Sequence, residues 1–211
     1  MKKILYILSV FVIFGCYPSD ERAPKMSKAS FSKNNVTKNP NPFHKAKNVI
    51  FMVGDGMGIS QITAGIYSSS KKLNIEKFSV IGLHKSHSYN NLITDSAAGA
   101  TAFATGEKTY NGAIGMTPDK KSVETILEQA EKKHMATGIV TTSTIVHATP
   151  ASFIAHQPQR KMYEEIAADF MKMEIDFFIG GGKKYFDRRD KDERNLCEEM
   201  EANNYLSLIH I

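Results

Sequence analysis

An apolar run that stops at a carboxylate between glycines constrains the fold of this chain most. Val49–Val53 is continuously apolar, and Asp55 follows it between Gly54 and Gly56. A short apolar run bounded by glycine predicts a buried strand. Because open α/β sheets hold their ligands at the carboxyl ends of strands, we expect Asp55 at a ligand site. A carboxylate there favours a metal ion, since it would repel an anion unless a cation lay between them.

A second segment places a hydroxyl at the start of a helix. Asp95–Thr105 is rich in alanine, which predicts a helix, and Ser96 stands at its beginning. Free N–H groups at a helix start favour an anion and lower the cost of forming an alkoxide. An Asp-Ser pair before alanines is more often only a helix cap. Together with a metal-binding carboxylate, however, Ser96 indicates phosphoryl transfer.

Strands and helices alternate along the rest of the chain, which predicts a parallel sheet with covering helices. The expected strands are 78–83, 136–142 and 175–179, and the expected helices are 59–70, a segment around 123–130, and 160–173. On the second of these helices, Glu128 and Lys132 are spaced to form an exposed ion pair. His84 and His87 follow a predicted strand and are interpreted as surface groups or as neighbours of the site, because no carboxylate adjoins them.

Composition favours an ordinary globular domain. The chain has 211 residues and a formal net charge of +5. The positive excess is spread over the amino-terminal part and over scattered lysines, without a basic face or interleaved aromatic residues. We therefore expect no nucleic-acid partner.

The amino terminus has the pattern of an export signal. Residues 1–16 combine a basic start with an apolar run that is too short to span a membrane. The run ends at Cys16 in a sequence that resembles the cleavage box of bacterial lipoproteins, and a plain signal peptide is the alternative. Residues 17–46 are polar and contain several prolines, which predicts a disordered tether. The expected location is the periplasm or the cell surface, with a lipid on Cys16 as an anchor in the outer membrane.

The last residues, 206–211, differ in character from the rest. Their sequence, Leu-Ser-Leu-Ile-His-Ile, resembles the translation of an adaptor used in making sequencing libraries. The hypothesis is that the reading frame leaves a genuine gene fragment after Tyr205. A natural stop codon directly after Ile211 in the resequenced locus would contradict it.

Several blocks of the sequence, in this order and at these separations, resemble the alkaline phosphatase family. The blocks are 47–58, 94–101, 103–115, 147–152 and 155–160. The resemblance covers residues 47–205 and implies the amino-terminal part of a catalytic domain. The implied fold class is α/β, a three-layer sandwich with a mostly parallel central sheet, incomplete at the carboxyl end. Absent strands would leave an apolar sheet edge that invites aggregation.

The resemblance also implies the chemistry. Members of the family hydrolyse phosphate monoesters with two zinc ions and one magnesium ion. Asp55 matches the carboxylate that bridges the second zinc and the magnesium, and Thr149 matches a magnesium ligand. Ser96 matches the nucleophile, which becomes a phosphoserine. Arg160 matches the arginine that grips the phosphate, for which its planar fork is suited, and Asp95 matches the acid that steadies it.

His147 stands where some members of the family carry aspartate, which helps to hold the magnesium through water. A neutral imidazole removes a negative charge near the third metal site, so we expect weaker magnesium retention or partial zinc occupancy there. Cys197 has no partner if Cys16 is lipidated, so the disulfides of the family are not expected.

The zinc ligands of the family are not found in this chain. Neither Asp-His nor Asp-x-x-x-His occurs, and the seven histidines do not make such a site. We expect the complete protein to be an alkaline phosphatase, with a homodimer as its usual form, and the chain alone to turn over little or nothing. The alternatives are a sulfatase or phosphodiesterase of the same superfamily, or a noncatalytic surface lipoprotein. The natural phosphate ester is not encoded in any pattern that we recognise.

Overall fold

The computed structural model describes residues 46–207 of the chain. The chain divides into two units, with the boundary between Phe51 and Met52. The described part of the first unit, residues 46–51, contains neither helix nor strand. The predicted signal segment 1–16, nearly all of the predicted tether 17–46, and the terminal residues 208–211 lie outside the described residues.

A parallel pair of strands lies at the centre of the second unit. β1 (Gly138–Thr144) pairs with β2 (Phe177–Gly181), with Gly138 opposite Phe177 and Val140 opposite Ile179. Parallel strands need a crossover connection, and here it contains the helices α4 (Ala148–Ala151) and α5 (Tyr163–Asp169). The predicted fold class, α/β with a parallel sheet, is confirmed, and residues 46–207 contribute two strands to that sheet.

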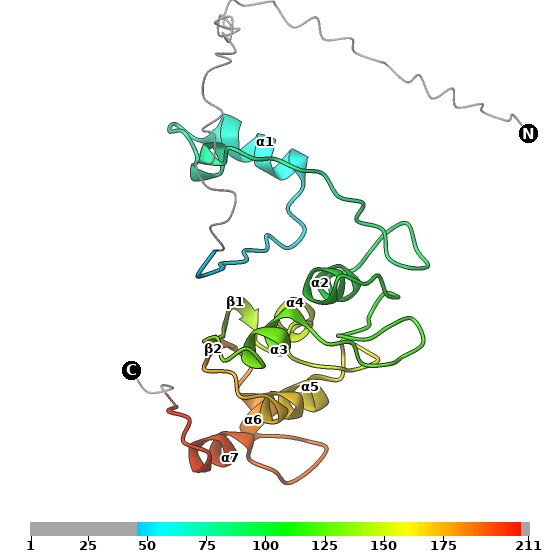
Figure 1. The fold of residues 1–211 in the computed structure, drawn as a ribbon, viewed down its shortest axis with the longest axis vertical. Helices are drawn as coiled ribbons and strands as arrows, with labels where there is room; N and C mark the ends of the chain where they lie inside the picture. The colour runs from blue at the N-terminus through cyan, green and yellow to red at the C-terminus, as the bar shows by residue number, and fades with distance from the viewer. Residues whose placement is uncertain (1–45, 208–211) are drawn as a thin grey trace, which may run out of the picture. The chain divides into compact units, whose positions relative to one another are not determined.

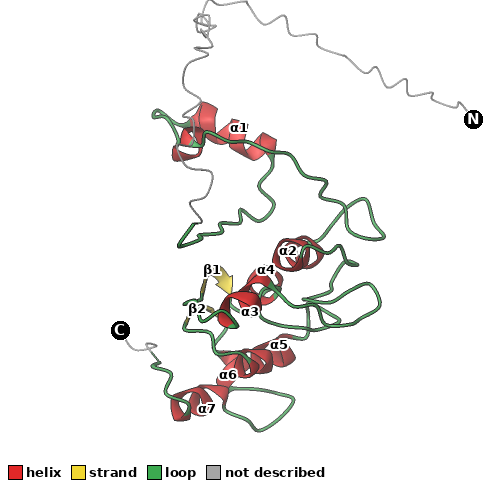
Figure 2. Ribbon diagram, viewed as in Figure 1, coloured by secondary structure: helices red, strands yellow, loops and turns green. Residues whose placement is uncertain are grey.

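Helices account for most of the remaining regular structure (Figures 1 and 2). They are α1 (Ile59–Ser68), α2 (Ser96–Thr105), α3 (Ile126–Glu131), α4 (Ala148–Ala151), α5 (Tyr163–Asp169), α6 (Lys184–Asp187) and α7 (Leu196–Ala202), with 3₁₀ turns at Asn74–Lys77 and Phe170–Lys172. In Figure 1, α5, α6 and α7 lie next to one another below the strands. Within the described part of the chain, no helix is both long and apolar enough to cross a bilayer.

The core is built from apolar side chains of segments that are distant in sequence. Ile145 and Val146 follow β1, Ile166 and Phe170 come from α5 and the turn after it, and Leu196 begins α7; all are almost fully buried. Phe170 also contacts the rings of Phe178 and Phe186, with centroids 5.0 and 5.8 Å apart. This core fixes the end of β1, which leads directly to α4 and the candidate site.

Two predicted strands are absent. Residues 49–53 and 78–83 form no strand in the structure, although both are apolar. Within the second unit, Val80, Ile81 and Leu83 are 85, 88 and 88% exposed. A strand needs a neighbour that satisfies its N–H and C=O groups, and among residues 46–207 the only strands that pair in a sheet are β1 and β2. An apolar run predicts the tendency to form a strand but does not supply this neighbour.

The predicted ion pair on α3 is also wrong. Lys132 pairs with Glu124, not with Glu128, at 2.6 Å. Glu128 turns back to the start of α3, where it accepts a hydrogen bond from the N–H of Thr125 at 2.7 Å, and it contacts His156 Nε2 at 3.0 Å. Burial raises the pKa of Glu128, but the hydrogen bonds from His156 and Thr125 outweigh it, and the pKa is lowered overall.

Candidate active site

The start of α2 holds the predicted nucleophile. Asp95 is the N-cap in extended conformation, and its Oδ1 accepts a hydrogen bond from the N–H of Ala98 at 2.9 Å. Ser96 is therefore the first residue of the helix, as predicted. Gly106 ends the helix in the left-handed region, with φ of 79°. Asp and Gly are residues that commonly cap the two ends of a helix, so the bounds of α2 agree with its local sequence.

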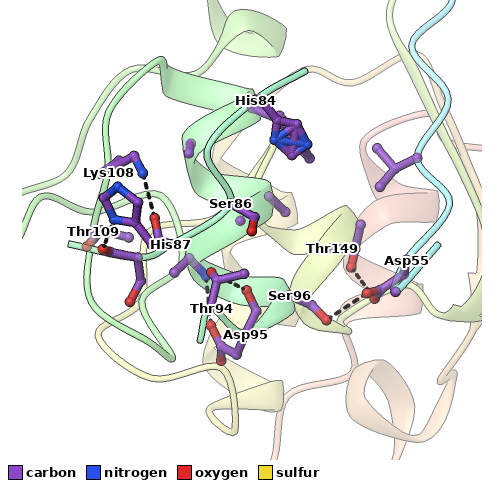
Figure 3. A pocket seen from close by; sticks show the side chains of 18 of the residues that line it. Asp55, His84, Ser86, His87, Thr94, Asp95, Ser96, Lys108, Thr109 and Thr149 are labelled. Carbon is purple, nitrogen blue, oxygen red and sulfur yellow. Dashed lines mark hydrogen bonds between the residues drawn. The ribbon is translucent and has the colours of Figure 1, made fainter. Parts of the chain in front are cut away.

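Asp55 lies beside two hydroxyl groups that are far from it in sequence. It stands in a tight turn, in which the N–H of Met57 donates to the carbonyl of Gly54. Ser96 Oγ donates to Asp55 Oδ1 at 3.0 Å, and Thr149 Oγ1 donates to Asp55 Oδ2 at 2.9 Å. Figure 3 shows both hydroxyls directed at this carboxylate.

Buried hydroxyls join α2, which carries Ser96, to α4, which carries Thr149. Ser152 Oγ donates to the carbonyls of Ala97 and Ala148, at 3.3 and 2.8 Å. Thr101 Oγ1 contacts the same hydroxyl at 3.3 Å. Both side chains are fully buried, so these bonds form where water does not compete for them. The two helices that supply the hydroxyls to Asp55 are thus held in a fixed relation.

Arg160 is held by two residues that were predicted to belong to the site. Its Nη1 donates to Asp95 Oδ2 at 3.1 Å, and its Nη2 contacts His147 Nε2 at 3.2 Å. A guanidinium has no acceptor, so His147 Nε2 must accept this bond, which places the imidazole proton on Nδ1 in the neutral ring. Asp95 therefore serves two groups, with one oxygen on the helix start and the other on Arg160.

A cavity of about 600 Å³ connects these groups. Asp55, Asp95, Ser96, Thr149 and Arg160 all line it, whereas His147 does not. The lining also includes His84, Lys85, Ser86, His87 and Lys108. In Figure 3, His84 lies at the top, and His87 and Lys108 lie at the left, away from Asp55. The two histidines predicted as surface groups or neighbours of the site thus border the cavity.

The carboxylate and hydroxyl oxygens at Asp55, Ser96 and Thr149 are suitable ligands for a hard divalent cation. Two oxygens that each bind a metal at about 2.1 Å cannot be more than roughly 4.2 Å apart, and both hydroxyls lie within that limit of the carboxylate. They do not fit a zinc site by themselves, because zinc prefers nitrogen and sulfur ligands. Within residues 46–207, no group of three or more His, Cys, Asp or Glu side chains is placed to hold a metal ion.

Three polar residues that support the site were not assigned from the sequence. Asn111 bonds the backbone on both sides of Thr94, and the buried pair Thr101 and Ser152 joins α2 to α4. Each makes its contacts with segments distant in sequence, so no local pattern reveals them. The only signal was that all three lie within or beside the blocks that resemble a known family.

Fold and site together define the class: a parallel α/β protein in which a helix-start serine, a carboxylate and an arginine line one cavity. The family model described as alkaline phosphatase matches residues 46–209. The chain belongs to the alkaline phosphatase family.

Named relatives agree with this assignment. Alkaline phosphatase 4 of Bacillus subtilis is 38% identical over 96% of this chain and 45% of its own length. The alkaline phosphatase of Escherichia coli K12 is 34% identical over 76% of this chain and 41% of its own length. Among solved structures, the alkaline phosphatase of the Antarctic bacterium TAB5 superposes with a TM-score of 0.71 at 44% identity, over 74% of this chain and 46% of that one. The chain thus spans less than half the length of these relatives.

Proposed function

We propose that the complete protein hydrolyses phosphate monoesters through a phosphoserine formed on Ser96. The observation that carries this proposal is that Asp55 accepts hydrogen bonds from both Ser96 and Thr149, at the wall of a cavity that Arg160 also lines. Membership of the alkaline phosphatase family supports the choice of phosphate monoesters.

Each residue of this chain has a defined part in the proposed reaction. Arg160 binds two oxygens of the phosphate, and Asp95 keeps the guanidinium oriented toward the cavity. Ser96 Oγ attacks phosphorus, the P–O bond to the alcohol breaks, and the alcohol leaves. Water then cleaves the phosphoserine and releases inorganic phosphate. Dividing the displacement into two steps lets the same groups serve both.

Metal ions are part of the proposal. When bound, they neutralise charge that develops on the phosphate and lower the pKa of nucleophilic oxygens. We assign Asp55, Thr149 and Ser96 to metal binding, with His147 near the magnesium site, in a set of two zinc ions and one magnesium ion. The remaining zinc ligands would come from sequence outside the described residues. Support comes from a solved histidine-to-aspartate mutant of the TAB5 enzyme, which has Mg bound in its M3 site.

Location and assembly are proposed from sequence and family. The pattern at residues 1–16 supports export and a lipid on Cys16 as an anchor in the outer membrane. The family supports a homodimer. The 211-residue chain by itself is proposed to be nearly inactive, because its described residues do not supply a zinc site.

A substrate panel tests the function. The complete protein, supplied with zinc and magnesium, is assayed on chromogenic phosphate monoester, phosphate diester and sulfate ester. We expect the monoester to be hydrolysed fastest, with activity lost on chelation and in Ser96→Ala. Preference for the diester or the sulfate would favour another enzyme of the superfamily, and failure on all three would favour a noncatalytic lipoprotein. Robust turnover by the 211-residue chain alone would overturn the proposal that it is nearly inactive.

A further inference from the structure

The segment 110–115 contacts two parts of the site. One is the stretch 157–160, which ends at Arg160, and the other is the stretch 93–95, which ends at Asp95. On one side it forms a short antiparallel pairing with 157–160. The N–H of Arg160 donates to the carbonyl of Gly112 at 2.7 Å, and Ile114 and Gln157 exchange two backbone bonds at 2.9 and 3.0 Å. Tyr110 Oη adds a hydrogen bond to the carbonyl of Pro158 at 3.0 Å. The backbone of Arg160 is thereby fixed to this segment.

On its other side the same segment holds the start of α2. Asn111 Oδ1 accepts from the N–H of Asp95 at 3.2 Å, and Asn111 Nδ2 donates to the carbonyl of Ile93 at 2.9 Å. The side-chain amide of Asn111 thus forms hydrogen bonds with the backbone on both sides of Thr94, immediately before α2. These two bonds need a donor and an acceptor on one side chain, a combination that aspartate, leucine and alanine lack.

The segment also has little freedom to shift. Gly115 has φ of +56°, and a Cβ there would collide with the carbonyl of Ala155. The carbonyl of Ala113 accepts from the buried hydroxyl of Thr101, and the N–H of Gly115 donates to the same hydroxyl, at 3.1 and 3.0 Å. Packed interiors have low compressibility, so a displacement on one side of the segment is passed on to the other side.

We propose that Asn111 is a positioning residue that sets where Asp95 presents its carboxylate to Arg160. Asn111 does not line the cavity and so acts through Asp95. Asp95 has its N–H fixed by Asn111, its Oδ1 fixed by Ala98 and its Oδ2 on Arg160. Loss of the amide leaves the peptide at 94–95 free to rotate, which displaces the carboxylate from the guanidinium. The inference rests on the proposed function, because it concerns how Arg160 is prepared to bind phosphate.

The test measures binding of inorganic phosphate to the complete, metal-loaded protein by titration calorimetry. We expect Asn111→Ala to weaken binding about tenfold, which corresponds to about 1.4 kcal/mol. Asn111→Leu, which is close in size but can neither accept from Asp95 nor donate to Ile93, should behave similarly and serves if the alanine variant folds poorly. The matched control is Asn195→Ala, which removes an asparagine cap on α7 away from the cavity and should leave phosphate binding unchanged.

A double-mutant cycle separates positioning from general destabilisation. In an Arg160→Ala background, Asn111→Ala should change phosphate binding by less than about twofold, because the group that it positions is absent. An undiminished effect in that background, or wild-type affinity in both Asn111 variants, would overturn the proposal. Wild-type protein that neither hydrolyses monoesters nor binds phosphate would instead contradict the proposed function on which it rests.

Discussion

At the scale of single residues, the site depends on side chains that each make two different contacts. Asp55 receives two hydroxyls, one on each oxygen, and Asp95 divides its oxygens between the start of α2 and Arg160. A suitable substitution of such a side chain removes one of its two contacts and keeps the other. The side chains of Asp95 and Arg160 are 26 and 25% exposed, so their attraction is only partly screened by solvent.

Replacing Asp95 by asparagine should separate the cap from the ion pair. Asparagine caps a helix as well as aspartate does, so Asp95→Asn should leave the melting temperature almost unchanged. The loss of the charge frees Arg160, and inhibition by inorganic phosphate should weaken about three- to tenfold, which corresponds to about 0.7 to 1.4 kcal/mol, the net worth of one ordinary hydrogen bond. Asp95→Ala should in addition lose about 1 kcal/mol of stability through the missing cap. Unchanged phosphate inhibition in Asp95→Asn would contradict the role of this pair.

Replacing His147 by aspartate should strengthen magnesium binding. A carboxylate adds negative charge near the proposed magnesium site, so His147→Asp should retain magnesium at about tenfold lower free concentration. The metal content after dialysis at fixed free magnesium measures this. His147→Asn, which changes the shape without adding charge, is the control and should not gain magnesium. Equal magnesium content in the aspartate variant and the wild type would count against the prediction.

At the scale of elements, the helices follow from local sequence better than the strands do. α2 was predicted within one residue from its alanine-rich sequence, and in the structure Asp95 and Gly106 mark its ends. β1 and β2 were predicted with shifted bounds, whereas 49–53 and 78–83 were predicted as strands and are not. A helix satisfies its own hydrogen bonds, but a strand depends on a neighbour that local sequence does not specify.

In the site, too, local sequence predicts some features, whereas others depend on segments that are distant in sequence. Asp55 and Ser96 were predicted from a strand end and a helix start, whereas Thr149 was predicted from the resemblance alone, and the structure places the three side chains in contact. Their functional roles remain predictions. Asn111 could not be assigned, because its amide acts on a segment 16 and 18 residues away in sequence.

The pH dependence of stability tests whether the charge of Glu128, at the start of α3, stabilises the fold through His156 and Thr125. Its pKa is lowered from 4.5, so its contribution to stability is present above that value and is lost as the pH falls through the folded pKa. Glu128→Gln keeps the capping box and removes the charge opposite His156. We expect it to lose about 1 kcal/mol of unfolding free energy near pH 7, with the difference from wild type vanishing at acidic pH.

Urea denaturation at a series of pH values measures the effect. Glu124→Gln is the matched control, since Glu124 pairs with the exposed Lys132 and should matter less. A Glu128→Gln deficit that does not depend on pH would show that packing, and not the charge, accounts for the loss.

At the scale of the whole molecule, this chain supplies the attacking serine, the phosphate-binding arginine and one carboxylate of the proposed site. It spans less than half the length of its relatives, and its described residues hold no cluster of zinc-type ligands. We therefore assign the proposed activity to the complete protein and expect further metal ligands there.

Zinc binding should distinguish the chain from the complete protein. Zinc sites use three or four protein ligands, so the 211-residue chain should bind zinc at least about a hundredfold more weakly than the complete protein. Competition with a chelating dye measures both affinities under the same conditions. Equal affinities would contradict the assignment of the missing ligands to sequence outside the described residues.

The central claim, that Ser96 beside Asp55 is the group that accepts phosphate, is tested most directly by trapping. The complete, metal-loaded protein is incubated with radiolabelled inorganic phosphate, quenched in acid, and digested to locate the label. We predict a labelled peptide whose phosphate is on Ser96, with the label lost in Ser96→Ala and after removal of metal. Label on another residue, or none in protein that hydrolyses the monoester, would contradict the account.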